Sequence, residues 1–156
     1  ARRLSLPLRR VTVDRIEIDD GAGDSEGNGG QLLGRALETA LERNGFFPER
    51  DTETVAAGAV GKVTLRLGRT TGYRIEPGFH YSRWEAELRI SEPGGDGAVF
   101  SELYPVKGFG SDSERAALDA LRKVRAEVFE SFAAAAADRI ELKFAGEDYG
   151  ERRRPF

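Results

Sequence analysis

The stretch FHYSRWEAELRI, from Phe79 to Ile90, is the best-patterned segment of the chain and decides the fold. Apolar residues alternate there with charged ones: Trp84, Ala86, Leu88 and Ile90 against Arg83, Glu85, Glu87 and Arg89. This period of two is typical of a β-strand with one buried face and one solvated face. The buried face needs a second layer, which the rest of the chain must supply.

A first amphipathic helix precedes this strand and is one candidate for that layer. Its apolar residues recur at helical spacing: Leu32, Leu33, Ala36, Leu37, Ala40 and Leu41. Asn28 with Gln31 resembles a capping box at the start, and Gly45 supplies a left-handed stop at the end. We expect Phe46 and Phe47 to pack beneath the end of this helix.

A second, longer helix is predicted after the strands, from about Asp112 to Ala137. Ser111 with Glu114 forms a capping box at its start. Its predicted apolar face comprises Ala117, Leu121, Val124, Val128 and Phe132, with Leu118 and Phe129 beside it. Two helices on one face of the sheet would complete a two-layer structure.

Four further segments have an extended pattern. Val11 and Val13 alternate in one phase and Ile16 and Ile18 in the other, which predicts a bulge near Asp14 and Arg15. Another strand is expected around Val60 to Leu67. A bend is expected after it at Thr70, Thr71 and Gly72. Tyr73 and Ile75 continue the extended pattern before a turn at Pro77 and Gly78. The central strand leads through the hairpin turn from Glu92 to Gly97 into a strand from Ala98 to Tyr104, which Gly108-Phe109-Gly110 is expected to break. Ile140, Leu142 and Phe144 also alternate and leave room for a final edge strand.

The predicted fold class is therefore α+β. We expect a two-layer sandwich with a mainly antiparallel sheet of four to five strands and two helices on one face, in the order β-α-β-β-β-α with a final β allowed. Residues 1–10 are expected to form an extended basic arm, residues 11–145 a single α+β domain, and residues 146–156 a charged tail.

Composition narrows the functional classes. The formal net charge is −3, which argues against a nucleic-acid-binding surface because phosphate binding requires an excess of clustered cations. The chain has no cysteine, so it offers neither disulfides nor thiolate chemistry. No apolar run approaches the roughly 20 residues needed to span a bilayer. The order helix, three strands, helix resembles a double-stranded-RNA-binding domain, but Asp112 and Glu114 stand where that family presents lysines to phosphate.

Candidate ion sites in the glycine-rich loop from Asp19 to Gly30 are incomplete. Asp24, Glu26 and Asn28 have the spacing of calcium ligands, but the twelfth position is Arg35 instead of a carboxylate. Gly29 and Gly34 have the spacing of a phosphate-binding loop, but Arg35 follows where lysine is required. We expect a flexible acidic turn, and whether it binds an ion stays open.

Catalytic candidates are also weak. His80 is the only histidine, which excludes a multi-histidine metal site and favours a structural or surface role. Glu85 and Glu87 share a strand face, but Arg83 and Arg89 flank them, so cross-strand ion pairing is the expected arrangement. Trp84 lies on the apolar face and is interpreted as core. We therefore assign no catalytic, cofactor-binding or metal-ligating residue and expect no enzyme activity.

The region from Arg10 to Ala137 resembles the small α/β domains of bacterial envelope lipoproteins. That group includes curli-secretion, penicillin-binding-protein-activator and lipopolysaccharide-assembly lipoproteins, and the amino-terminal domain of the Tol-system propeller protein. The resemblance is carried by LLGRALETAL, by AAGAVGKVTLRL, by RWEAELRISEPGGDGAVFSE and by GFGSDSERAALDAL. It implies a non-enzymatic domain in the periplasm or on the periplasmic face of the outer membrane, lipid-anchored if a leader cysteine was removed, that docks onto a protein partner in the envelope.

Two docking modes follow from the sequence. An open sheet edge can accept a strand from the partner, which we favour, or the arginines at Arg2, Arg3 and 152–154 can bind an acidic surface. Two alternatives stay open: a small-molecule-binding domain or enzyme with a pocket between sheet and helices near Tyr73, His80 and Tyr81, and a structural subunit of a larger complex.

Overall fold

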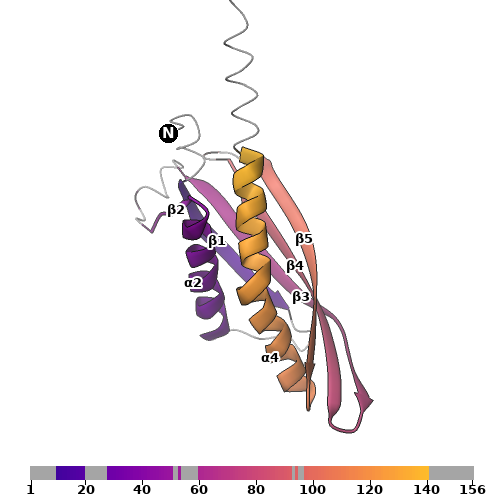
Figure 1. The fold of residues 1–156 in the computed structure, drawn as a ribbon. Helices are drawn as coiled ribbons and strands as arrows, with labels where there is room; N and C mark the ends of the chain where they lie inside the picture. Colours follow the sequence, from indigo (N-terminus) through magenta and orange to yellow (C-terminus); the bar gives the residue numbers. More distant parts are fainter. Residues whose placement is uncertain are drawn as a thin grey trace, which may run out of the picture.

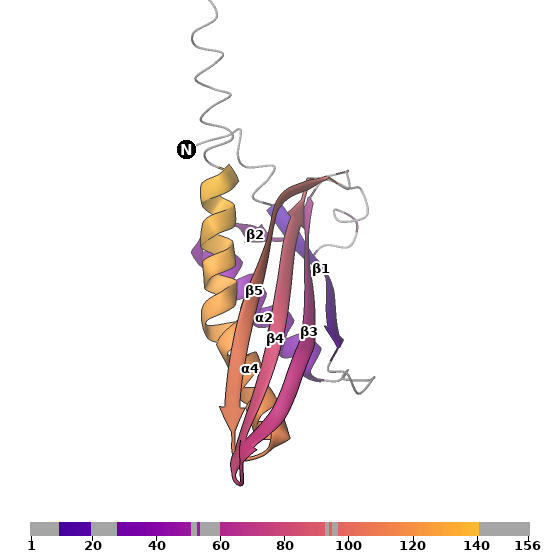
Figure 2. The same cartoon turned by 90° about the vertical axis from the view of Figure 1, so that its right-hand side faces the viewer.

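The computed structural model describes residues 10–19, 28–50, 53, 60–92, 94 and 97–140. These residues form one sheet with two helices on one of its faces (Figure 1, Figure 2). In chain order the elements are β1 (Arg10–Asp19), α2 (Asn28–Arg43), β2 (Phe47–Pro48), β3 (Gly61–Glu76), β4 (Phe79–Ser91), β5 (Ala98–Gly110) and α4 (Ser113–Lys123). The last helix continues through a π-helical turn, η1 (Val124–Val128), and on through residues 129–140. The predicted α+β class is confirmed.

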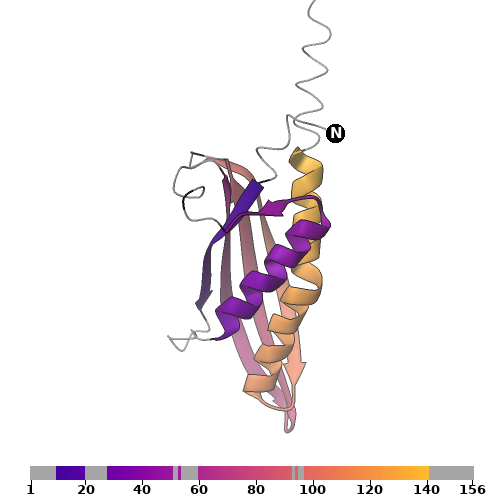
Figure 3. The same cartoon turned by 90° about the vertical axis from the view of Figure 1, so that its left-hand side faces the viewer.

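The sheet is mixed, with the strand order β2-β1-β3-β4-β5. Strands β3, β4 and β5 are antiparallel neighbours, whereas β1 is parallel to both β2 and β3. A parallel pair needs a crossover connection, and α2 lies on that connection between β1 and β3 (Figure 3). Along β1 the register moves from Val13 opposite Val63 to Arg15 opposite Thr64, so Asp14 is the extra residue of a bulge. The predicted bulge is confirmed, and it lets Ile16 and Ile18 join Val13 against the core.

The helix ends show how local residues fix the element bounds. Gly45 has φ 92°, and the amides of Gly45 and Phe46 donate to the carbonyls of Glu42 and Leu41 at 3.1 and 3.0 Å. This is the left-handed stop expected from the sequence. At α4 the predicted cap is displaced by one residue, because the Asp112 side chain, not that of Ser111, accepts the Arg115 amide at 2.8 Å.

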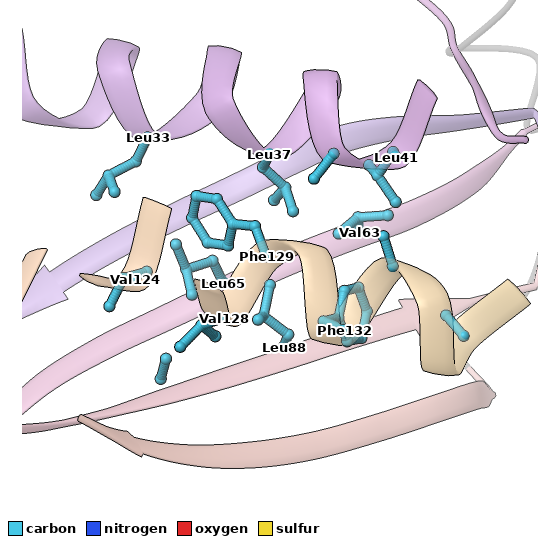
Figure 4. Packing of buried hydrophobic residues seen from close by; sticks show 14 of the residues in the cluster. Leu33, Leu37, Leu41, Val63, Leu65, Leu88, Val124, Val128, Phe129 and Phe132 are labelled. Carbon is cyan, nitrogen blue, oxygen red and sulfur yellow. The ribbon is translucent and has the colours of Figure 1, made fainter. Parts of the chain in front are cut away.

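A continuous apolar core fills the space between the sheet and the helices (Figure 4). Leucines of α2 face Phe129 and Phe132 of the second helix, above Val63, Leu65 and Leu88 of the sheet. Trp84 is 1% exposed and its Nε1–H donates to the buried Ser82 Oγ at 2.8 Å, which confirms it as core. Within the described residues, packed side chains therefore fill the central part of the layer between sheet and helices.

Two residues of the predicted helix faces, Leu32 and Leu118, are 55 and 57% exposed. Phe47, expected to pack beneath the end of the first helix, is also 57% exposed, while Phe46 beside it is buried as expected. In the second helix the later part of the predicted face is buried as expected, but at the start Ala116 and Ala120 are buried in place of Ala117 and Leu121, which are only partly buried. The small alanines allow this part of the helix to approach β5 closely.

The glycines of β5 explain that close approach. The sequence predicted a break at Gly108-Phe109-Gly110, but β5 continues to Gly110. A Cβ atom at Gly108 would lie 2.5 Å from the Ala120 nitrogen, and one at Gly110 would lie 2.5 Å from the Ala116 nitrogen. The glycines are present because the helix backbone passes directly over the strand, not because the strand ends there.

The remaining expectations concern the ends of elements. Strand β3 continues through Thr70 to Gly72 as far as Glu76, and its pairing with β4 is interrupted between Arg69 and Thr71 by a β-bulge or irregularity, at the place where a bend was expected. Ile140 is buried in the last helix and does not begin a strand. Leu142 and Phe144, the arm before Arg10, the loop 20–27 and the tail 146–156 lie outside the described residues.

Candidate docking surface

The hairpin of β3 and β4 extends beyond the part of the sheet that the helices cover (Figure 1). From Gly61 to Leu67 every second residue of β3 is buried, whereas residues 70–76 are all exposed. The turn at Pro77 and Gly78 closes the hairpin, with Gly78 at φ 79°, where glycine is favoured. The end of the hairpin therefore contributes little to the core.

Apolar side chains gather at this end, four of them aromatic, and form a patch that we call the hairpin patch: Tyr73, Ile75, Phe79, Tyr81 and Phe109. The rings of Tyr73 and Tyr81 have centroids 5.0 Å apart, those of Tyr81 and Phe109 are 5.5 Å apart, and Phe79 stacks on Phe109 at 5.6 Å. Tyr73 is opposite Tyr81, and Tyr81 is opposite Phe109, in the strand register, so the three rings share one face of the sheet.

The hairpin patch is exposed to solvent. Tyr73 is 58% exposed, Ile75 is 46%, and Phe79 and Phe109 are each 39%. Solvated strand faces usually carry polar side chains, and contiguous exposed apolar side chains mark interaction sites. Aromatic rings also bury a large area on binding and are enriched at the energetic centres of interfaces.

One sheet edge, formed by β5, is protected beside the hairpin patch. The Phe109 amide donates to Asp119 Oδ2 at 3.0 Å, and Lys123 Nζ donates to the Lys107 carbonyl at 2.8 Å. Pro105, two residues before Lys107, has no N–H to offer a neighbouring strand. The pKa of Asp119 is lowered to about 2, first by the hydrogen bond from the Phe109 amide and then by Arg122, whose guanidinium donates to Asp119 Oδ1 at 2.7 Å. Side chains of α4 therefore block strand addition over this half of β5.

The other parts of the sheet edges are not capped in this way. The first half of β5, residues 98–103, precedes Pro105, and Leu103 there is 51% exposed. On the opposite side, β2 pairs only with Arg10 and Val11 of β1, and no other described strand follows β1 on that side. The predicted mode of strand addition is therefore restricted to these two segments.

The solvated face of the sheet carries a shallow hollow of about 350 Å³ between β1, β3, β4 and β5. Arg66 spans it, 3.6 Å from Glu17 and 3.7 Å from Glu87, and is 72% exposed. The cross-strand ion pairing expected for Glu87 is present, and its partner is Arg66, directly opposite in the neighbouring strand β3. Exposed pairs of this kind contribute little to stability.

The remaining predicted residues are placed as follows. His80 follows Phe79 in β4, opposite Arg74 and Gly110 in the register, and its Nδ1 atom is buried without a hydrogen-bond partner. Among the described residues no group of three or more histidine and carboxylate side chains has the geometry of a metal site. The calcium-like ligands lie in or beside the loop 20–27, outside the described side chains.

From the sequence alone, Tyr73 and Tyr81 are expected only at the mouth of a pocket, and the hairpin patch is not predicted. A signal was available, because Phe79 and Tyr81 occupy the same phase of the strand as the charged Arg83 and Glu85. Aromatic side chains on the solvated phase of an amphipathic strand indicate a surface that something else covers.

Comparison with known proteins finds no matching family model and no matching curated protein. Among solved structures, a Helicobacter pylori protein classed as a homolog of a neuraminyllactose-binding hemagglutinin is 16% identical and aligns over 88% of both chains, with a TM-score of 0.54. The two chains share a fold. At this level of identity, the comparison shows nothing about function.

Lipoproteins are also among the structures that this chain resembles. A Caulobacter crescentus protein classed as a lipoprotein is 22% identical over 87% of this chain and 91% of its own, with a TM-score of 0.36. A Neisseria meningitidis lipoprotein is 12% identical over 80% and 97%, with a TM-score of 0.47. The curli-secretion, penicillin-binding-protein-activator and lipopolysaccharide-assembly groups stay predictions. No helix in the described part of the chain is both long and apolar enough to cross a membrane.

Proposed function

We propose that this chain is a non-enzymatic docking domain of the bacterial cell envelope that binds a larger protein partner through the hairpin patch. The observation that carries the proposal is the exposure of Tyr73, Phe79 and Phe109, which ring contacts through Tyr81 join into one cluster, with the exposed Ile75 two residues along β3 from Tyr73. Clusters of this kind are protein-binding surfaces more often than they are free surface. The envelope location rests on the sequence resemblance to envelope lipoprotein domains.

The position of the hairpin patch suits a domain tethered from its amino-terminal side. Val11 is opposite Gly61, the first residue of β3, and β3 then runs 16 residues to Glu76 at the hairpin turn. At about 3.3 Å per residue, the patch lies roughly 50 Å from the start of β1. A lipid anchor before residue 10, as the resemblance implies, would direct the patch away from the membrane and toward a protein.

Strand addition is the complementary part of the proposal. Because Asp119, Lys123 and Pro105 protect the second half of β5, a partner strand would add along residues 98–103 or along β1 beyond Val11. Backbone pairing at these segments would give affinity with little sequence preference. The aromatic rings of the hairpin patch would then determine which partner binds.

Site-specific photocrosslinking in cells of the native host tests this proposal. A photoreactive phenylalanine analogue at Tyr73 is expected to give one discrete crosslinked protein, because this side chain is 58% exposed within the hairpin patch. The same analogue at Lys62, an exposed residue at the other end of β3, is the control and should give none. Equal crosslinking at both positions, or none at Tyr73, would exclude the patch as the docking surface.

A small-molecule ligand is the second candidate for the same surface. The 5.0 Å contact between the Tyr73 and Tyr81 rings forms an aromatic platform on which a sugar ring can stack. The H. pylori protein that shares the fold is named for neuraminyllactose binding. A thermal-shift titration with neuraminyllactose and a panel of metabolites decides between the two candidates. If a compound stabilises the parent chain but not a Tyr73→Ser variant, the small-molecule hypothesis is supported. If no compound stabilises the parent chain, that hypothesis is excluded.

A further inference from the structure

A groove along the β5 edge, beside the hairpin patch, carries an excess of positive charge. Its charged lining consists of Arg83, Lys107 and Lys123 with one carboxylate, Glu127, and its volume is about 570 Å³. Pro105, Val106 and Val128 complete the wall. We call this feature the β5 groove.

The cations of the β5 groove outnumber its one carboxylate, Glu127, and two of them are directly opposed. Arg83 of β4 and Lys107 of β5 are directly opposite each other in the strand register. Like charges at opposed positions destabilise a sheet. In addition, the Arg83 Nε atom is buried and has no hydrogen-bond partner, and a buried donor on a charged group calls for an acceptor. A carboxylate between the two side chains would satisfy both.

Lys123 is held in position at the rim of the same groove. Its ammonium donates to the Lys107 carbonyl at 2.8 Å and lies 3.2 Å from Asp119 Oδ2. These two contacts fix the side chain and leave one of its three donors for a ligand. The adjacent helical turn, Val124–Val128, is π-helical, and such turns occur frequently at functional sites.

Side chains, more than the strand edge, are available to a ligand in the β5 groove. Along the edge Asp119 takes the Phe109 amide, Lys123 takes the Lys107 carbonyl and Pro105 has no N–H. The groove also adjoins the hairpin patch, since Lys123 Nζ lies 5.4 Å from the centroid of the Phe109 ring. A ligand that fills the groove therefore meets the aromatic rings as well.

We infer that the β5 groove binds the carboxylates of an acidic segment of the protein partner, whose aromatic or aliphatic side chains pack on the hairpin patch. This inference rests on the proposed docking function and names the chemistry of the partner. Charge complementarity to Arg83 and Lys107 selects the acidic side chains, and the apolar wall and neighbouring rings favour a protein segment over a free anion.

A random short-peptide library displayed against the whole domain tests this inference. Selected peptides are expected to be enriched in Asp and Glu next to aromatic residues. Lys107→Glu should weaken the binding of such a peptide about tenfold, since it replaces an attraction with a repulsion, and Lys107→Arg should preserve it. Lys62→Glu makes the same charge change at the far end of the sheet and should have no effect. Lys123 is kept in all variants because its ammonium also caps β5.

The possible results separate the inference from the proposal on which it rests. Peptides without acidic enrichment that still compete for the patch at Tyr73 would overturn the inference and leave the docking function standing. No selected peptide, together with no crosslink at Tyr73, would overturn both. Equal weakening by Lys62→Glu and Lys107→Glu would show non-specific charge attraction and would also overturn the inference. Binding to phosphatidylglycerol vesicles in preference to the selected peptides would assign the groove to a membrane surface instead.

Discussion

Replacing Gly108 by alanine tests the closest contact in the fold, where the last helix passes over β5. An added Cβ atom would lie 2.5 Å from the Ala120 nitrogen and 2.8 Å from the Ala120 Cβ, well under the 3.4 Å at which ordinary contact begins. The obstructing atoms belong mainly to helix backbone, so no side chain can rotate away. The helix must move off the strand.

The expected cost follows from that geometry. Overpacking a well-filled core costs typically 1–3 kcal/mol, and a backbone obstacle places Gly108→Ala near the upper end, at about 3 kcal/mol. Against a total stability of roughly 5–15 kcal/mol for a domain, this is a large loss. For a chain of this size it corresponds to a decrease in melting temperature of about 10 °C.

Urea denaturation followed by tryptophan fluorescence measures the loss. Trp84 is the single tryptophan and is 1% exposed, so its emission reports unfolding of the core directly. Gly68→Ala is the matched control, because Gly68 also lies in a strand and an added Cβ there meets nothing within 4 Å. We expect the control to stay within about 0.5 kcal/mol of the parent chain. If the Gly108 and Gly68 variants were equally stable, the account of how this helix packs on β5 would be wrong.

Two further predictions concern α4 and the helical residues that continue from it to residue 140. Asp119→Asn should lower the free energy of unfolding at neutral pH by about 1–2 kcal/mol, a figure reduced for solvent screening at a side chain that is 21% exposed. The pKa of Asp119 is lowered from 3.8 to about 2 in the fold, so its contribution to stability is complete above about pH 4 and disappears as the pH falls through 2. The difference in unfolding free energy between the variant and the parent chain, measured by urea titration, should therefore shrink over that interval. A difference that stays constant would refute this prediction. Phe132→Ala removes a fully buried ring whose centroid lies 5.7 Å from that of the Phe100 ring. The variant should lose about 3–5 kcal/mol of unfolding free energy by the same measurement. A loss below about 1 kcal/mol would show that the core is not packed as described.

Local patterns predicted most of the elements because each depends on neighbouring residues. The alternation around Trp84 established a strand with a buried face, since successive side chains of an extended chain point to opposite sides. The phase change at Asp14 predicted a bulge for the same reason, and the register shift there confirms it. Gly45 ended α2 as expected, because only the local backbone conformation is required for that stop.

Where these local patterns gave a wrong prediction, the structure at that position depends on a segment distant in the sequence. Gly108 reads as a strand breaker in isolation, and only the helix backbone that crosses above it explains why the glycine is needed within a strand. Leu118 fits the helical apolar stripe by spacing, but the helix turns its alanines toward the sheet and leaves this leucine 57% exposed. Periodicity fixes which residues share a face but not which face the neighbouring layer covers.

The sequence by itself determined the α+β class, the single buried tryptophan and the absence of cysteine chemistry, since these follow from side-chain period and composition. Only the tertiary structure decided the features that carry the functional proposal. The hairpin patch, the capping of Phe109 by Asp119 and the opposition of Arg83 to Lys107 each depend on strand register or on helix placement. Register and placement are set by long-range packing of the whole core, and no local stretch of sequence encodes them alone.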